Sequence, residues 1–543
     1  MTASSESGRD VVLGHLRQQA DWDVIVVGGG ATGLGVAVDA AARGYRVLLL
    51  EAVDYAKATS SRSTKLIHGG VRYLEQGHVK LVYEALHERG ILLRNAPTLV
   101  RPLPFLVPCY RRFETFWYGV GLGLYDKMAG RLRTGKTRRL DRRSALERLP
   151  SLSARKLRGG ILFYDAQFDD SRLAVLLLRN IQRLGGVAVN HCRVESFLRE
   201  DGRIRGVVAR DAFSDADFEL RANVVVNATG PFADQIRRLE DPEARATLVL
   251  SRGSHLILPG TAVSGGIGLL IPKTRDGRVL FAIPWKDRML VGTTDIPVAE
   301  PEWEPQPTAE EWDFLLEHLA LYLPGTEKEP VLSAFAGLRP LAAGKAGSAG
   351  NTAAVSRDFM IEVSRGGLVS VLGGKWTTYR RMAEATMDRA AEVGGLPRRA
   401  CRTSDMPLEW FPFTGRLGWD ADPSWEPSEV ATMVEERPEL LEAFHPRLPY
   451  SRLAVVAAVR WEQAMTVEDV LARRTRSLLL DASAAGEAAP EVASVMAREF
   501  GRDESWVETQ VEEFRTLTRR YAPPSTVEGD RVPAAGPGLP GGL

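Results

Sequence analysis

The fold of this chain follows from residues 23–52, which read DVIVVGGGATGLGVAVDAAARGYRVLLLEA. A short β-type run comes first, a run of helical composition ending in a glycine follows, and a second β-type run closes the stretch. This order predicts a βαβ unit. Gly28-x-Gly30-x-x-Gly33 stands between the first strand and the helix, and Glu51 ends the second strand about 20 residues further on.

Each part of this motif has a physical role in binding a dinucleotide. Gly28 makes the tight turn, Gly30 lets the backbone approach a pyrophosphate, and Gly33 lets the helix pack on the strand. The N-terminus of the helix favours the phosphate charge. Glu51 can accept hydrogen bonds from both ribose hydroxyls, which disfavours a 2′-phosphate there. A structural glycine turn without a ligand is the alternative, and the complete strand-helix-strand-acid order favours the dinucleotide site.

Composition limits the remaining classes of protein. The 543 residues exceed what one hydrophobic core usually serves, so two or three domains are expected. Lys and Arg number 70 against 69 Asp and Glu, so no global charge indicates a nucleic-acid partner. The three cysteines form no CxxC pair, which argues for a reducing compartment and against a disulfide framework or a cysteine metal site. No metal site is predicted.

Targeting and membrane-spanning segments are not expected. The N-terminus has no apolar signal region, and it is too acidic for a typical mitochondrial transit peptide. Residues 253–272 lack acids, Lys and Arg, but Pro259 and four internal glycines interrupt them. A strand, a loop and a second strand are therefore expected there rather than a spanning helix.

The rest of the chain predicts an α/β fold with a helical end. β-type runs recur up to GGLVSVLGGKW, and they favour a parallel α/β core interleaved with antiparallel excursions. After about residue 400, runs such as SRLAVVAAVRWEQA carry helical apolar spacing. The expected division is a flexible lead-in (1–22), a discontinuous cofactor domain (23–95, 150–245 and 335–395), a β-rich substrate domain (96–149 and 246–334), an α-helical C-terminal domain (396–522) and a disordered Pro- and Gly-rich tail (523–543).

Two later turns favour FAD over NAD as the dinucleotide. The motif alone does not distinguish them, but its place near the N-terminus, with the fold returning to it much later, suggests a flavin. Ala228-Thr229-Gly230 ends a strand in small residues suited to close approach of a cofactor. Gly373-Gly374 ends another strand and starts a helix, whose N-terminus could stabilise negative charge on a reduced flavin. A plain strand-to-helix turn is the alternative in each case.

The chain resembles the FAD-dependent glycerol-3-phosphate dehydrogenases in a joint pattern of motifs. From about Asp23 to Ala390 these are the opening motif with ATSSRSTKLIHGGVRYL, then VNATGP, RGSHLILP, VGTTD, GLRPL, SRDF and GGKWTTYRRMAE, while MTVEDVLARRTR resembles the helical C-terminal domain of that family. The resemblance implies a Rossmann-type FAD domain interleaved with a β-rich substrate domain and a helical cap. It implies oxidation of sn-glycerol 3-phosphate to dihydroxyacetone phosphate by hydride transfer from C2 to FAD, with electrons passed to a membrane quinone. It also implies a cytoplasmic protein held peripherally on the inner face of the cell membrane, and a homodimer is a further expectation.

Matching positions give the expected site residues. The cofactor-binding set is Gly28, Gly30, Ala31, Thr32, Gly33, Glu51, Ala52, Thr59, Ser60, Ser61, Lys65, His68, Gly69, Gly70, Val194, Ala228, Thr229, Gly230, Gly374, Lys375 and Thr377. The substrate-binding set is Arg72, Tyr73, His255, Arg339, Arg357 and Lys375. Within it, Arg72, His255, Arg339 and Lys375 are expected to be catalytic. A dianionic phosphate needs cations, and Arg suits bidentate contact with its oxygens. A structural or surface ion pair is the alternative for each cation.

The reaction also needs a base for the C2 hydroxyl, and histidine has a pKa near neutral. His255 and His68 both lie in matched motifs. We favour His255, because His68 lies in the loop expected to run along the cofactor. Arg72 could stabilise the developing alkoxide. A satisfied structural histidine is the alternative for either position.

Residues 111–143 mix aromatic side chains with a basic cluster between Arg131 and Arg143. This pairing suits an anionic membrane interface. A packed helix followed by a solvated basic loop is the alternative.

Two rival functions remain for the whole chain. One is an oxidase that passes electrons to oxygen, and the other is a non-catalytic FAD-binding scaffold. The scaffold is disfavoured because the expected base and cations are all present. The basic run has no nucleic-acid-binding module around it.

Overall fold

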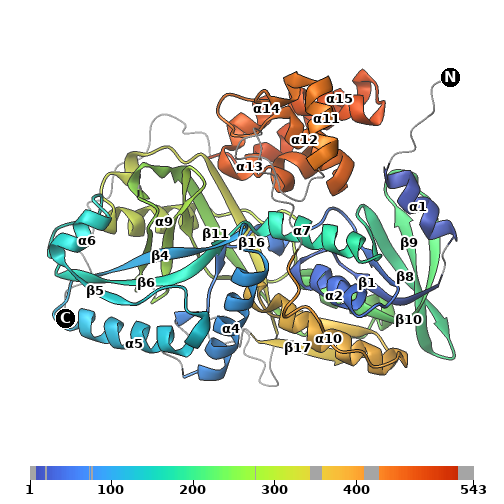
Figure 1. Ribbon diagram of the computed structural model, residues 1–543, viewed down its shortest axis with the longest axis horizontal. Coiled ribbons are helices and arrows are strands. Elements are labelled where there is room, and N and C mark those ends of the chain that lie inside the picture. The colour runs from blue at the N-terminus through green and yellow to red at the C-terminus, as the bar shows by residue number, and fades with distance from the viewer. Residues whose placement is uncertain are drawn as a thin grey trace.

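The computed structural model describes residues 8–18, 21–71, 74, 77–263, 265–275, 277–342, 358–408 and 427–523 (Figure 1). Three expected substrate residues, Arg72, Tyr73 and Arg357, lie outside these ranges, as do residues 524–543 of the expected tail. Their roles therefore stay predictions.

The first sheet contains the predicted βαβ unit. Its central strand β1 (Asp21–Val27) pairs in parallel with β2 (Val47–Leu50) and with β10 (Asp217–Asn227). Val24, Ile25 and Val26 are fully buried, since both faces of the parallel core are covered. The strand order is β17-β18-β10-β1-β2-β7, and β9 and β8 continue from β10 as an antiparallel excursion. The remaining strands are β7 (Val187–Val189), β8 (Cys192–Glu200), β9 (Arg203–Asp211), β17 (Phe359–Val363) and β18 (Val369–Gly373).

Helices α2 (Ala31–Ala42), α7 (Asp170–Arg183) and α10 (Tyr379–Gly394) share a hydrophobic core with this sheet. In Figure 1 they lie beside one another along it. Small residues bring α2 close to α10: a Cβ built on Gly35 would lie 2.8 Å from the Tyr379 ring. A separate hydrophobic core packs α1 (Gly8–Gln18) against this sheet, including its strands β8 and β9. Helix α8 (Ala233–Glu240) follows β10.

The second sheet is largely antiparallel, in the order β15-β11-β14-β13-β12-β4-β6-β3, with β16 on β11 and β5 on β6. Its strands are β3 (Leu66–Ile67), β4 (Val100–Cys109), β5 (Arg138–Asp141), β6 (Gly159–Phe168), β11 (Leu248–Pro259), β12 (Gly268–Ile271), β13 (Leu280–Trp285), β14 (Arg288–Gly292), β15 (Ile296–Val298) and β16 (Ser333–Ala342). The associated helices are α4 (Val79–Asn95), α5 (Glu114–Met128), α6 (Arg142–Arg148) and α9 (Ala309–Tyr322).

Three strands of this second sheet fall in segments that the sequence assigned to the cofactor domain. β3 lies within 23–95 and pairs with β6, β6 itself lies within 150–245 and pairs with β4, and β16 begins just before 335 and pairs with β11. Sequence pattern gives strand identity but not partner choice, because partners are set by long-range packing. The exact domain boundaries stay a prediction.

The helical C-terminal region comprises α11 (Pro427–Glu436), α12 (Arg452–Glu462), a π-helix (Asp469–Arg474), α13 (Ser477–Leu480), α14 (Ala482–Phe500) and α15 (Glu504–Thr518). It forms the upper group in Figure 1. Buried ion pairs fasten it to the loop after β2: Arg474 Nη1 lies 2.7 Å from Asp54 Oδ2, and Arg473 pairs with the same carboxylate. Burial alone would raise the pKa of Asp54, but Arg474 and Arg473 outweigh it and hold that pKa well below its usual value.

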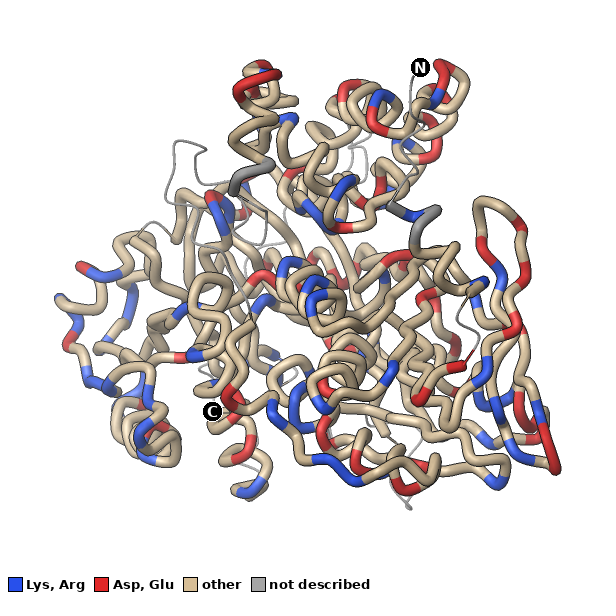
Figure 2. Tube along the Cα trace, turned by 45° about the vertical axis from the view of Figure 1, so that its right-hand side comes forward, with Lys and Arg blue, Asp and Glu red and all other residues tan. Residues whose placement is uncertain are grey.

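Among the described helices, none is both long and apolar enough to cross a bilayer. Acidic and basic residues are interspersed over most of the molecule (Figure 2). A charged partner would therefore have to be attracted by a local cluster rather than by the overall field.

Candidate functional site

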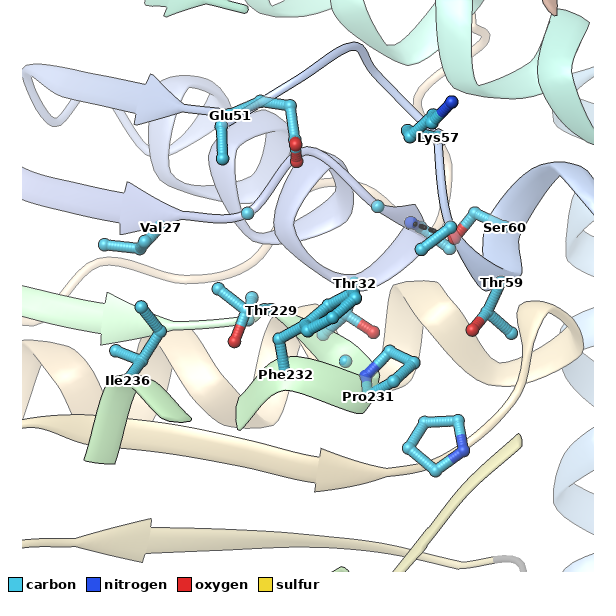
Figure 3. A pocket seen from close by; sticks show the side chains of 18 of the residues that line it. Val27, Thr32, Glu51, Lys57, Thr59, Ser60, Thr229, Pro231, Phe232 and Ile236 are labelled. Carbon is cyan, nitrogen blue, oxygen red and sulfur yellow. Dashed lines mark hydrogen bonds between the residues drawn. The ribbon is translucent and has the colours of Figure 1, made fainter. Parts of the chain in front are cut away.

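A cavity of about 300 Å³ opens where the parallel strands β1, β2, β10 and β18 end. The carboxyl edge of such a sheet is where ligands bind in doubly wound folds. Most of the expected cofactor residues line it: Gly28, Gly30, Ala31, Thr32, Glu51, Ala52, Thr59, Ser60, Val194, Ala228, Thr229, Gly230, Gly374 and Lys375. Figure 3 shows Glu51 and Ser60 above and Thr229, Phe232 and Pro231 below them.

The turn at the start of α2 leaves no room for side chains. Gly28 has a φ of +105°, and a Cβ there would lie 2.7 Å from Ala228 O. A Cβ on Gly33 would lie 1.8 Å from Gly28 O. The N-cap residue of α2 is Gly30, which supplies no side-chain cap, while Ala31 N donates to Ser60 Oγ at 2.9 Å (Figure 3). A helix N-terminus whose own N-cap residue is glycine, facing a cavity, suits a pyrophosphate.

Glu51 is positioned for the ribose. Its Oε2 accepts from Gly29 N at 2.6 Å and its Oε1 from Val53 N at 2.9 Å. Burial raises the pKa of Glu51, and the two backbone hydrogen bonds lower it and so oppose that effect. Each carboxylate oxygen keeps a second lone pair for a ribose hydroxyl. The glycine turn, the helix terminus and this acid together fit the adenosine diphosphate half of FAD.

Several cavity residues were not found from the sequence. Phe232 and Trp303 stack with ring centroids 4.1 Å apart, and Pro340 and Trp376 line the cavity beside them. Trp376 directly follows the Gly373-Gly374-Lys375 turn, so its position in the sequence could have indicated that it lies at the cavity. Trp303 lies in the connection between β15 and α9 and carries no motif.

Lys57 is another lining residue that the sequence did not indicate. Its ammonium pairs with Glu304 at 2.6 Å and with Glu468 at 2.5 Å. Glu468 belongs to the C-terminal region. One lining residue of the cavity, Lys57, is therefore positioned in part by an ion pair with the helical C-terminal region.

Replacing Gly28 with alanine is expected to lower the FAD content of the purified protein severely. The left-handed conformation costs an alanine about 1–2 kcal/mol, and the contact with Ala228 O adds a steric cost. The ratio of flavin to protein absorbance measures the effect. Gly202→Ala is a matched control, because Gly202 also has a positive φ (+74°) but meets nothing within 4 Å. Equal flavin content in the Gly28→Ala variant and this control would contradict the assignment.

The loop after β2 runs between the two sheets. Thr59 Oγ1 donates to Leu338 O at 2.5 Å, and Trp376 Nε1 donates to Ser60 O at 2.8 Å. Further along, Gly69 N donates to Tyr125 Oη at 2.7 Å. The remaining expected cofactor residues, Gly33, Ser61, Lys65, His68, Gly69, Gly70 and Thr377, are not among those that line the cavity. The His68 backbone and Thr377 Oγ1 contact each other at 3.3 Å.

The structure places Lys65 in a buried ion pair. Its ammonium lies 2.6 Å from Asp170 Oδ2 and donates to Ser61 O at 2.7 Å. Burial, then repulsion from Arg476, lowers the pKa of Lys65 to about 7, although Asp170 opposes both. Arg476, from the C-terminal region, donates to the same Asp170 and Ser61 O. Lys65 thus links the loop to that region.

His255 lies on β11, between Gly292 of β14 and Phe335 of β16. Its ring stacks on Phe335 with centroids 4.8 Å apart, and its Nε2 lies 2.9 Å from Thr64 Oγ1. A Cβ on Gly292 would lie 2.2 Å from the His255 ring, so glycine makes room for it. Burial first, then the charges of Arg339 and Lys65, lowers the pKa of His255 well below its usual value. The imidazole is therefore neutral at physiological pH.

Arg339 lies on β16 and is held in one position. Its Nη2 donates to Thr293 Oγ1 at 2.8 Å and its Nη1 donates to Thr294 O at 3.1 Å. A Cβ on Gly253 would lie 2.3 Å from Nη2, so the guanidinium passes over a glycine. The next residue, Pro340, lines the cavity.

Lys375 lines the cavity itself, in the turn between β18 and the 3₁₀ turn Trp376–Thr378. Of the two expected cations, Lys375 lines the cavity, and Arg339 lies on the second sheet directly before the lining residue Pro340. His255 is joined through Thr64 to the loop that borders it.

Comparisons with known proteins agree with this geometry. Residues 23–380 match the family described as FAD dependent oxidoreductase, and residues 426–507 match the C-terminal domain of alpha-glycerophosphate oxidase. A probable mitochondrial glycerol-3-phosphate dehydrogenase of Caenorhabditis elegans is 38% identical over 94% of this chain and 75% of its own length.

Two solved structures are also similar. The glycerol-3-phosphate dehydrogenase of Bacillus halodurans, complexed with FAD, has a TM-score of 0.74 at 28% identity over 96% of this chain and 98% of its own. The L-alpha-glycerophosphate oxidase of Mycoplasma pneumoniae, with FAD bound, has a TM-score of 0.54 at 17% identity over 72% and 98%, a likeness of fold alone. These matches confirm the predicted fold class and FAD as the cofactor.

Proposed function

The chain belongs to the family of FAD-dependent glycerol-3-phosphate dehydrogenases, and on this premise we propose that it oxidises sn-glycerol 3-phosphate to dihydroxyacetone phosphate. The observation that carries the proposal is a dinucleotide cavity lined by Lys375, with Arg339 next to the lining residue Pro340 and with the charge of Arg339 acting on a neutral buried histidine. When bound, FAD supplies the acceptor for the hydride that leaves C2 of the substrate.

The substrate phosphate binds to the cations. Arg339 arrives with its guanidinium already oriented by Thr293 and Thr294, so little side-chain entropy is lost when it takes a phosphate oxygen. Lys375 adds a second positive charge from the opposite sheet. Arg72, Tyr73 and Arg357 are proposed to complete this site.

His255 removes the proton of the C2 hydroxyl. A buried neutral imidazole can accept at Nε2, directly or through the Thr64 hydroxyl 2.9 Å away. Stacking on Phe335 fixes the ring plane, and the Gly292 backbone packs against the ring. Arg339, whose charge reaches His255, also stabilises the negative charge that develops on the substrate oxygen.

The electrons are proposed to pass to a quinone at the inner face of the cell membrane. Support comes from α5 and its N-cap residue Phe113, because Phe113, Phe116 and Trp117 are exposed next to a basic segment. Oxygen is the alternative acceptor, because an oxidase shares the fold.

Two parallel assays with glycerol 3-phosphate distinguish these acceptors. One follows reduction of a water-soluble quinone analogue without oxygen, and the other follows hydrogen peroxide formed in air. Quinone reduction at a rate well above peroxide formation is expected. Peroxide as the main product would instead assign the chain to the oxidases.

A further inference from the structure

A second hollow, of about 310 Å³, lies beside α5 and shares no lining residue with the FAD cavity. Its lining comes from α5, from the segment that leads into β5, and from β5 itself. The lining residues are Gly119, Gly123, Asp126, Lys127, Arg133, Lys136, Thr137 and Arg139. None of them belongs to the site described above.

This hollow is strongly basic. Four of its lining residues are Lys or Arg, and Asp126 is its one acid. Asp126 is already engaged, because its Oδ1 lies 3.0 Å from Arg133 Nε and its Oδ2 accepts from Thr137 N at 3.2 Å. Lys127, Lys136 and Arg139 therefore leave a positive excess that an anion can neutralise.

Two glycines shape the floor of the hollow. Gly119 and Gly123 are four residues apart, one above the other on the same face of α5. A Cβ on Gly119 would lie 2.9 Å from Arg139 Nε, so glycine lets this guanidinium cross the helix. A Cβ on Gly123 meets nothing within 4 Å, so that position keeps the hollow open.

An apolar stripe runs along the same helix beside the hollow. Phe113 and Trp117 are each 69% exposed, and Phe116, Val120 and Leu124 are more than half exposed. The spacing of three, four and seven residues puts these side chains on one face, while the neighbouring flank carries Gly119, Gly123 and Lys127. The inner face is anchored by the buried Leu122 and Tyr125.

We propose that the hollow binds the phosphate of an anionic phospholipid headgroup while the stripe enters the adjoining acyl region. The inference rests on the membrane location in the proposed function and adds a headgroup site to it. Exposed aromatic residues sit at the headgroup level of a bilayer, so the flanking cations meet lipid phosphate there. Arg139 ties the two features together, since its guanidinium lies 5.8 Å from the centroid of the Phe116 ring.

The test uses the full-length FAD-loaded protein in sedimentation with phosphatidylglycerol or phosphatidylcholine vesicles. Gly123→Leu fills the hollow without changing charge, and Gly121→Leu adds the same side chain on the other flank, where a Cβ also meets nothing within 4 Å. Wild type and Gly121→Leu are expected to prefer phosphatidylglycerol by at least tenfold, and Gly123→Leu is expected to lose most of that preference. Equal loss in both variants, or no preference in wild type, overturns the proposal.

A charge test complements the steric one. Lys127→Gln with Lys136→Gln is expected to weaken phosphatidylglycerol binding by about 30-fold, on the scale of two cations at a membrane surface. The matched control, Arg498→Gln with Arg502→Gln, removes two exposed charges from the helical C-terminal region and is expected to change binding less than about threefold. Equal effects of the two pairs would contradict a local site.

Two further measurements are needed. The first distinguishes a lipid headgroup from free phosphate as the ligand of the hollow, and the second tests the proposed function independently of lipid binding. If the hollow takes free phosphate instead, calorimetry with inorganic phosphate shows binding that Gly123→Leu abolishes while vesicle preference is unchanged, and the lipid assignment fails. Turnover of glycerol 3-phosphate by the wild type with a soluble acceptor, without vesicles, reports on the proposed function by itself. If the protein prefers phosphatidylglycerol but does not turn over glycerol 3-phosphate, the proposed function is wrong, while the hollow still binds the lipid headgroup.

Discussion

Replacing His255 with glutamine is expected to lower kcat for glycerol 3-phosphate by about 10²- to 10⁴-fold, the usual contribution of a positioned general base. Glutamine has no basic nitrogen, so the C2 hydroxyl proton loses its acceptor. The substrate phosphate still meets Arg339 and Lys375, so KM should change far less than kcat. Steady-state kinetics with a soluble acceptor measure both parameters.

His68→Gln is the matched control for this variant. His68 is half-buried, and its ring meets Phe281 edge-on at 6.2 Å. Its substitution is expected to lower kcat much less, while flavin content stays near that of the wild type in both variants. The reverse ranking, with His68→Gln the slower enzyme, would transfer the role of base to His68.

The pH profile tests the same residue without removing it. His255 accepts a proton only when neutral, so kcat/KM falls as the pH drops through its pKa. Burial, Arg339 and Lys65 lower that pKa, and the acid limb is therefore expected well below pH 6.5. Removing the charge of Arg339 weakens one of these causes, so the limb of an Arg339 variant should move to higher pH. If the acid limb of the Arg339 variant stays at the wild-type pH, the charge of Arg339 does not act on the base.

Arg339→Leu is the second substitution with a large expected effect. It removes a cation oriented by Thr293 and Thr294 next to the cavity, and losing one partner of a hydrogen-bonded charge pair costs about 2–5 kcal/mol. A loss of about 30- to 5,000-fold in kcat/KM follows, since each 1.36 kcal/mol is a factor of ten. Kinetics across a wide range of substrate concentration measure it.

Arg339→Lys serves as the control for Arg339→Leu. It keeps the charge but not the forked geometry, so it should recover only part of the loss. Thermal unfolding and flavin content report whether the contacts to Thr293 and Thr294 matter for folding alone. If the Leu and Lys variants show the wild-type kcat/KM, Arg339 does not contact the substrate.

The FAD-binding part of the fold was predictable because its signals are local. The Gly28-x-Gly30-x-x-Gly33 turn, Glu51 and the small-residue turn at Ala228-Thr229-Gly230 each follow a strand directly, and carboxyl ends of parallel strands meet at one edge. The helices after residue 400 could also be predicted, because the apolar periodicity of a helix is a short-range property of the sequence.

What the sequence did not indicate depends on contacts between distant segments. Trp303 reaches the cavity by stacking on Phe232, and no local pattern marks it. Lys65 was expected at the cofactor, but Asp170 and Arg476, which surround it, are far away in sequence. A lysine in a polar motif has the same sequence pattern whether it faces a ligand or a buried carboxylate.

The central claim is tested most directly by the visible spectrum of the purified flavoprotein during anaerobic addition of sn-glycerol 3-phosphate. Oxidation at C2 delivers two electrons to the flavin, so the flavin absorption band should bleach with substrate and return when an acceptor is added. Glycerol without the phosphate should leave the band intact, because Arg339 and Lys375 would then have no anion to hold. A band that persists with excess glycerol 3-phosphate, or that bleaches equally with glycerol, would contradict the proposed function.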